Sequence, residues 1–171
     1  LVEGQGGRAG LVMIGFGPED LKRDGLDQAL GGDPVIFLPG GHNVHGHETP
    51  LDMTALEEAL PELSKTVSSF AVAGYFAVRN PSHEIRVRER IREISHLPVT
   101  CSHELSSKLG GPRRALTTLL NARLVSMIDR LVGACEDFLI DHGIDAPMMV
   151  VRGDGALIAA SEAKVRPIET I

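Results

Sequence analysis

The chain has 171 residues, of which 43% are hydrophobic, and this is enough to bury the core of one ordinary domain. Its net charge of −6 arises in residues 1–80, which hold 11 acidic and 5 basic residues, whereas residues 81–171 hold 12 of each. Without Trp and without a basic face, no nucleic-acid partner is expected. Since no run approaches about 18 apolar residues, no membrane partner is expected either.

The two cysteines do not form a disulfide framework, because Cys101 falls in a strand pattern and Cys135 in a helix pattern. Reduced, buried thiols are typical of cytosolic proteins. We therefore expect a cytoplasmic location.

The first half of the chain alternates apolar runs with turn-forming segments. Residues 8–16 and 35–38 predict two strands, and residues 18–30 favour a short helix with poorly spaced leucines. Residues 39–48 form a loop by composition, rich in Gly and His.

The next helix is predicted to begin at Asp52 or Thr54. Thr54 and Glu57 have the spacing of a capping box. Pro61 is expected to end or kink this helix.

Residues 67–78 give the strongest strand pattern, almost continuously apolar and rich in small residues. Asn80 is the expected cap of a following helix, and residues 97–101 and 147–151 predict two more strands. The Asn80 helix is expected to bury Val87, Ile91 and Ile94.

A helix of about 30 residues is predicted from Pro112 or Arg113 to His142. Its expected buried stripe consists of Leu116, Leu120, Leu124, Met127, Leu131, Cys135 and Phe138.

Strands and helices alternate from residue 8 to residue 155, which predicts an α/β fold with a mainly parallel sheet and helices on both faces. The chain is expected to form a single α/β domain or a fragment of one, with a possible sub-boundary near residues 100–112. In such a sheet, ligands bind beyond the carboxyl ends of the strands. The loops expected at this edge carry His42, His45, His47, His83, Glu84, His103, Glu104 and Asp154.

His42, His45 and His47 are candidate metal ligands, because neutral imidazoles commonly bind metals. Their spacing matches no standard zinc pattern. A polar surface loop is the alternative interpretation.

Ser102, His103 and Glu104 place a hydroxyl, an imidazole and a carboxylate together, and His103 and Glu104 are the candidate catalytic residues. Adjacent residues of an extended segment point in opposite directions, so these three cannot form a triad among themselves. A serine here is equally suited to capping the turn that follows.

Gly153, Asp154 and Gly155 are candidate cofactor-binding residues, because backbone amides of a tight turn can contact phosphate. A plain turn after a strand is the simpler interpretation.

Several segments resemble the hydantoinase/oxoprolinase family, which includes the A subunit of N-methylhydantoinase, 5-oxoprolinase and acetone-type carboxylases. The clearest are Asn-Pro-Ser-His-Glu at residues 80–84 and Ser-His-Glu at residues 102–104. Six segments follow the family's order, at residues 1–12, 80–84, 102–106, 121–124, 151–157 and 166–171.

The resemblance implies a domain of the actin and sugar-kinase type, which is ribonuclease H-like. It also implies ATP and Mg as cofactors of the intact parent enzyme, with ATP phosphorylating an amide or enolate oxygen before hydrolysis or carboxylation. Both phosphate loops of the family would lie outside residues 1–171. The resemblance therefore implies a chain truncated at both ends, without its own cofactor and catalytically inactive alone.

The implied partners are the remainder of the parent polypeptide or a B-type subunit. A sheet edge left bare by missing strands would also favour self-association, so a homo-oligomer is expected. Two alternatives stay open: a stand-alone α/β ligand-binding or assembly module, and a metal-dependent hydrolase that uses the loop from His42 to His47.

Overall fold

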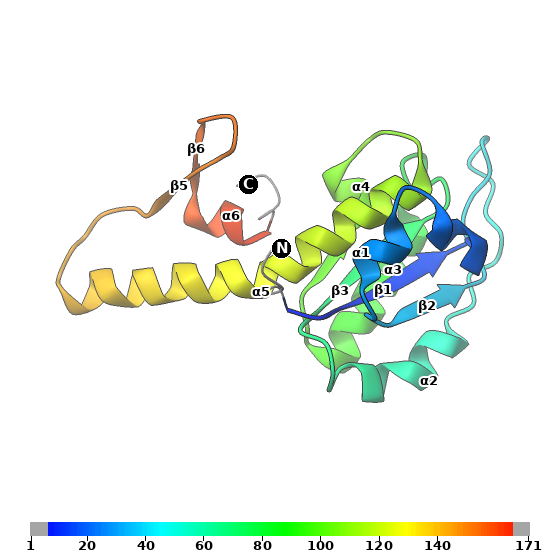
Figure 1. The fold of residues 1–171 in the computed structure, drawn as a ribbon, viewed down its shortest axis with the longest axis horizontal. Helices are drawn as coiled ribbons and strands as arrows, with labels where there is room; N and C mark the ends of the chain where they lie inside the picture. The colour runs from blue at the N-terminus through cyan, green and yellow to red at the C-terminus, as the bar shows by residue number, and fades with distance from the viewer. Residues whose placement is uncertain (1–6, 166–171) are drawn as a thin grey trace.

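The computed structural model describes residues 7–165. The family-like segments at residues 1–6 and 166–171 lie outside the described residues. Four parallel strands form one sheet in the order β2-β1-β3-β4 (Figure 1). The strands are β1 (Ala9–Ile14), β2 (Val35–Leu38), β3 (Ser69–Gly74) and β4 (Val99–Cys101). This arrangement confirms the predicted α/β class.

Helices cover both faces of the sheet because alternate residues of the central strands point to opposite sides. On one face, Val12 and Ile14 of β1 pack with helices α2 (Thr54–Leu63) and α3 (Ser82–Ser95). On the other face, Leu11 and Met13 pack with helices α1 (Leu26–Leu30) and α5 (Gly111–Asp141). The assignment of this sheet to an actin-like domain stays a prediction.

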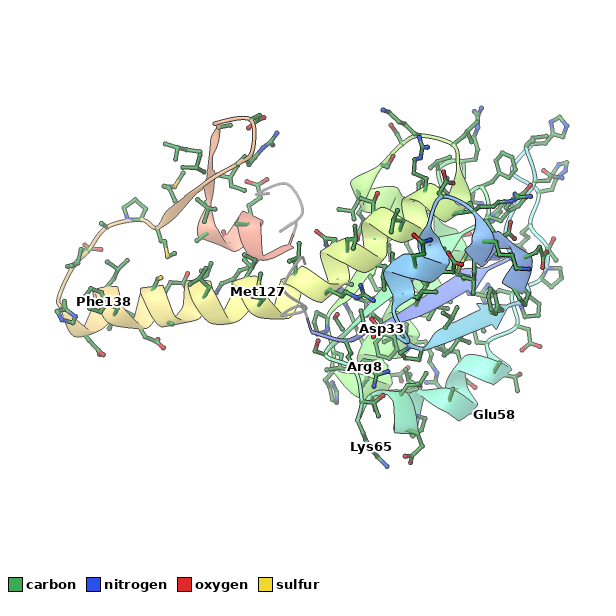
Figure 2. All side chains as sticks on the ribbon, in the orientation of Figure 1. Arg8, Asp33, Glu58, Lys65, Met127 and Phe138 are labelled. Carbon is green, nitrogen blue, oxygen red and sulfur yellow. The ribbon has the colours of Figure 1, made fainter. Side chains whose placement is uncertain are left out.

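Asp33 links β1 to a neighbouring helix at the amino-terminal end of the sheet. Its carboxylate accepts hydrogen bonds from the backbone N–H of Ala9 at 3.1 Å and from Arg123 Nε at 2.9 Å. It also pairs with Arg8 at 3.3 Å (Figure 2). One buried carboxylate thus ties β1 to α5 at the end of the sheet opposite the loops discussed below.

One predicted strand is shorter than expected, and one predicted helix is divided into two segments. The strand predicted over residues 67–78 ends at Gly74, because the chain turns there and Ala77 N–H bonds back to the Gly74 carbonyl at 3.2 Å. Phe76 occupies the left-handed region with φ 53° in this turn. The helix predicted over residues 18–30 is interrupted at Gly25, whose φ is 74°, and becomes a 3₁₀ turn, η1 (Pro18–Lys22), followed by α1.

The predicted Thr54–Glu57 capping box does not form, because Thr54 is the first residue of α2 and Met53 occupies the cap position. Asp52 supplies the capping contact instead, since its Oδ1 accepts from both the N–H and the Oγ1 of Thr54, at 2.9 and 2.7 Å. Asn80 caps the first turn of α3 by accepting from Ser82 N–H at 3.0 Å, although the helix itself begins at Ser82. Pro61 lies inside α2, which ends two residues later.

The last predicted strand does not join the parallel sheet. Strand β5 (Met149–Val151) pairs in antiparallel fashion with β6 (Leu157–Ala159), and α6 (Ala160–Val165) follows. Figure 1 shows this hairpin and α6 beside the C-terminal half of α5, away from the sheet. The expectation of a parallel strand is wrong here, because the tight turn between Arg152 and Gly155 returns the chain directly to its neighbour.

Helix α5 uses a different buried face from the one predicted. Ala115, Leu119 and Ala122 pack on the sheet, where small residues let the helix approach Ala71 and Ala73 closely. Of the predicted stripe, Leu124 is buried, whereas Leu131 and Phe138 are more than half exposed. Figure 2 shows Phe138 near the C-terminal end of α5.

No helix in residues 7–165 is both long and apolar enough to cross a bilayer.

Ile91 and Ile94 test which face of α3 supports the core. Ile91 is fully buried and Ile94 is 36% exposed, although the sequence pattern predicts both as buried. Ile91→Ala should lower the free energy of unfolding by about 2–5 kcal/mol, and Ile94→Ala by under about 1 kcal/mol. Urea denaturation measures both, and equal losses would contradict this packing.

Candidate functional site

Loops that follow β2, β3 and β4 meet at the carboxyl edge of the sheet. The loop after β2 carries Gly41 and His42, the turn after β3 leads to the start of α3, and β4 runs directly into helix α4 (Ser102–Leu105). These loops lie side by side because parallel strands end at the same edge. The hairpin turn of Gly153, Asp154 and Gly155 is not part of this edge, so the expected placement of Asp154 there is wrong.

Glu84 is the hub of this edge. Its side chain is fully buried, and its Oε1 accepts from Gly74 N–H and from Ser102 Oγ, each at 2.6 Å. Its Oε2 accepts from the backbone N–H of His103 at 3.1 Å and lies 2.5 Å from His103 Nδ1. A buried carboxylate is tolerated only when its oxygens are well satisfied. Four donors from two strand ends provide that here.

The contact with Glu84 sets the tautomer of His103. A carboxylate accepts hydrogen bonds, so Nδ1 carries the proton and Nε2 keeps its lone pair in the neutral ring. The His103 side chain is 20% exposed, whereas that of Glu84 is closed to solvent. A carboxylate that orients an imidazole in this way is typical of a proton acceptor, and the catalytic role expected for His103 stays a prediction.

Arg114 places a positive charge beside this hub. Its Nε donates to Ser102 Oγ at 3.3 Å, and its Nη2 donates to the Gly74 carbonyl at 2.8 Å. Burial lowers the pKa of Arg114, and the nearby Glu84 carboxylate acts in the opposite direction. Ser102 thus links the buried Glu84 carboxylate to the buried Arg114 guanidinium. The hydrogen bonds of this network offset part of the free energy that both charges lose when they leave water.

Glu104, the other catalytic candidate from the sequence, has both carboxylate oxygens engaged. Oε1 accepts from Arg88 at 2.6 Å, and Oε2 accepts from the N–H of Cys101 at 3.1 Å. Glu104 therefore caps α4 and pairs with α3. Its proposed catalytic role stays a prediction, and these contacts favour a positioning role.

The histidine loop divides into a buried and an exposed part. His42 is 3% exposed and lies against His83, with ring centroids 4.4 Å apart. His45 and His47 are exposed, and Asn43 Oδ1 accepts from the backbone N–H groups of both. The structure thus separates His42 from the two histidines with which the sequence grouped it.

His42, His83 and Glu48 form a different group of potential metal ligands, and their donor atoms lie within 4.8 Å of one another. However, His83 Nδ1 accepts from the buried Gly41 N–H at 3.0 Å, so its proton sits on Nε2 and faces Glu48 at 3.2 Å. A metal needs a free lone pair on that nitrogen. The hydrogen bonds therefore favour a structural role for His83.

Cys101 belongs to a second group of potential ligands, with Glu84 and His103. Burial, followed by the negative charge of Glu84, raises the pKa of the Cys101 thiol far above its ordinary value. The protonated thiol lies 3.7 Å from the Glu84 carbonyl. The Glu84 carboxylate is already shared between Ser102 and His103, so these contacts favour a structural role for this group.

The sequence predicts Glu84 and His83 at this edge, whereas no pattern in it points to Arg114. The available signal was the repeated His-Glu pair at residues 83–84 and 103–104, each following an expected strand. What it could not reveal is that Glu84 pairs with the second histidine, His103, and not with the first.

Comparison with known proteins identifies related sequences. The profile described as the hydantoinase/oxoprolinase N-terminal region matches residues 1–95. The acetophenone carboxylase gamma subunit of Aromatoleum aromaticum is 32% identical over 113 residues, covering 62% of this chain and 15% of that protein. The caprolactamase subunit alpha of Pseudomonas jessenii is 26% identical over 125 residues, covering 72% and 18%. The chain therefore spans less than a fifth of the length of either relative.

Two solved structures share the fold. The ATP-dependent caprolactamase from Pseudomonas jessenii superposes with a TM-score of 0.83 at 23% identity, covering 99% of this chain and 27% of that chain. The nucleotide-free acetone carboxylase superposes with a TM-score of 0.66 at 17% identity, covering 99% and 28%. At these identities the superpositions establish the fold alone.

Replacing the hub carboxylate should weaken the fold. Glu84→Gln exchanges one acceptor oxygen for an NH₂ group that faces buried donors, so we expect a loss of about 3 kcal/mol in the free energy of unfolding. Glu89→Gln, on the exposed face of the same helix, should change stability by under about 0.5 kcal/mol. Urea denaturation compares them, and two equally small losses would contradict the role of Glu84.

His42 should make the protein less stable in acid. Burial, and then repulsion by His83, lower the pKa of His42. The unfolded chain therefore takes up a proton before the folded one, and stability is lost as the pH falls below about 6.5. Urea denaturation at pH 7.5 and pH 5 should show a smaller acid loss for His42→Gln than for the wild type. A loss unchanged by His42→Gln, as expected for the control His45→Gln, would refute this assignment.

Proposed function

Because this chain belongs to the hydantoinase/oxoprolinase family, we propose that it forms part of an ATP-dependent enzyme that hydrolyses a cyclic amide or carboxylates a ketone. The observation that carries the proposal is the match of the family profile over residues 1–95, more than half of the chain. Hydrolysis of a cyclic amide corresponds to the relative named a caprolactamase, and carboxylation of a ketone corresponds to the relative named an acetophenone carboxylase.

The phosphoryl-transfer part of the reaction belongs outside this chain. Phosphoryl transfer requires groups that position and neutralise the phosphates. The glycine pairs of the sequence are not followed by the Lys-Ser/Thr of a phosphate-binding loop. In the complete enzyme, bound ATP would supply the phosphoryl group that activates the amide or enolate oxygen. The chain alone is accordingly inactive in this proposal.

This chain would contribute a proton-transfer group and the scaffold that holds it. His103 Nε2 accepts a proton while the buried Glu84 carboxylate stabilises the resulting imidazolium. Hydrolysis of an amide and formation of an enolate both require a proton to move at neutral pH, and an oriented imidazole serves either reaction.

The remainder of the parent polypeptide, or a second subunit, would supply the missing parts. Both relatives are named as subunits, which supports a larger assembly. The two free cysteines agree with a cytoplasmic location.

The decisive experiment uses the complete protein that contains this chain. With ATP and Mg²⁺, it should release ADP and phosphate only when given caprolactam, 5-oxoproline or hydantoin, or acetophenone with bicarbonate. The isolated chain should show no turnover. Failure of the complete protein with all four substrates would contradict the proposed function.

A matched pair of variants in the complete protein tests the proton-transfer role. His103→Asn should lower kcat at least about 100-fold, the usual contribution of a positioned acid or base, with little effect on ATP binding. His45→Asn, in the exposed part of the histidine loop, should leave both unchanged.

A further inference from the structure

A separate cavity of about 310 Å³ opens beyond the carboxyl ends of β1 and β3. It is lined by residues from η1 and the turn after it, from the turn after β3, and from the start of α5. This volume is at the small end of the range for ligand sites, which is about 300–1,000 Å³. The cavity is therefore suited to a ligand of a single ring.

The apolar wall of the cavity is aromatic. Phe16 and Tyr75 meet edge to face with ring centroids 5.4 Å apart, and Tyr75 meets Phe76 in the same way at 4.9 Å. Leu109 also lines the cavity and is 62% exposed, so it lies where the cavity meets solvent. Aromatic edges and faces provide a well-defined surface for a planar ring.

The positive part of the polar wall includes Arg114, and Asp20 and Asp24 line the cavity as well. Arg114 lines the cavity and is 4% exposed. Its guanidinium has five N–H donors, and its hydrogen bonds to Ser102, Lys108 and Gly74 use three of them. Two N–H groups of this buried cation have no hydrogen-bond partner among the described residues and can donate to a ligand.

The start of α5 adds to this positive part of the wall. Gly110 and Gly111 line the cavity, the cap residue Gly110 has no side chain to satisfy the first N–H groups, and the first turn holds no acidic residue. Pro112 has no N–H, so the N–H groups at the start of this 31-residue helix are those of Gly111 and Arg113, at the positive end of the helix dipole.

The acidic groups near the cavity are already paired. Asp20 pairs with Arg23 at 3.2 Å, and Asp24 pairs with Arg113 at 3.3 Å. Glu84, which acts on Arg114, is linked to it through Ser102 and is shared with His103. A singly charged anion suits this balance better than a doubly charged phosphate, because Asp20 and Asp24 both line the cavity.

We propose that this cavity binds a small planar carboxylate. The ring lies against Phe16 and Tyr75, and the carboxylate accepts hydrogen bonds from Arg114 and from the first N–H groups of α5. This site does not depend on the ATP chemistry proposed above, since binding is measured on this chain without nucleotide.

Benzoate is the probe, with benzamide as its neutral counterpart of the same shape. Titration of the ¹⁵N-labelled chain should shift the amide signals of Gly110, Gly111 and Tyr75, with a Kd at least about tenfold lower for benzoate than for benzamide. Equal affinities, no binding of benzoate at 10 mM (on the order of the weakest specific affinities), or shifts elsewhere in the chain would overturn the proposal.

Charge changes at Leu109 test the site without disturbing the core. Leu109→Asp should weaken benzoate binding about threefold and Leu109→Lys should strengthen it about threefold, both effects fading in high salt. Leu157→Asp is the matched control, because Leu157 is 64% exposed and lies on the distant hairpin. Identical affinities for the two Leu109 variants would contradict the site.

Arg114→Lys adds a third test, since it keeps the charge and removes the planar fork. If the variant unfolds cooperatively in urea, benzoate binding should fall at least about tenfold, and unchanged binding would overturn the role of Arg114. If the variant does not fold, the Leu109 pair and the shifted amides decide the proposal.

Discussion

The carboxyl edge of this protein depends on the burial of one carboxylate, that of Glu84. A charged group closed to solvent is costly unless donors surround it, so the loops that supply those donors cannot move independently. Gly74 comes from the end of β3, and Ser102 and His103 follow β4. Arg114 then extends the same network to the first turn of α5. Four elements are thus held in one arrangement by the electrostatic requirement of a single side chain, and the orientation of His103 follows from it.

Much of the sheet could be predicted from local patterns, and the errors have identifiable physical causes. Continuous apolar runs predict β1 and β3 because strands covered on both faces need apolar residues at every position. The pattern extends β3 past its C-terminal end because Tyr75 and Phe76 are apolar yet belong to a turn. It also predicts a parallel strand in place of the hairpin, because three residues carry too little periodicity to reveal their partner. On α5, spacing identified large residues as buried, whereas close packing on the sheet selected alanines.

The candidate site shows what sequence reasoning can and cannot reach. Histidines and carboxylates after strands are visible in the sequence, and the order of elements predicts that they share an edge. Pairing between them depends on contacts that are 18 or more residues apart in the chain, as between Glu84 and Ser102. The sequence therefore groups His42 with His45 and His47, its neighbours in the chain, whereas the fold places it beside His83. Hydrogen bonds then determine which ring nitrogen carries the proton. In His83 the proton is on Nε2, because Nδ1 accepts from Gly41, and in His103 it is on Nδ1, which donates to Glu84.

The proton-transfer role proposed for this edge depends on the tautomer of His103. The most direct measurement is the ¹⁵N NMR spectrum of the His103 ring at a pH where the imidazole is neutral. The account predicts a protonated Nδ1 bonded to Glu84 and an unprotonated Nε2. A spectrum with the proton on Nε2, or one with both tautomers equally populated, would contradict it.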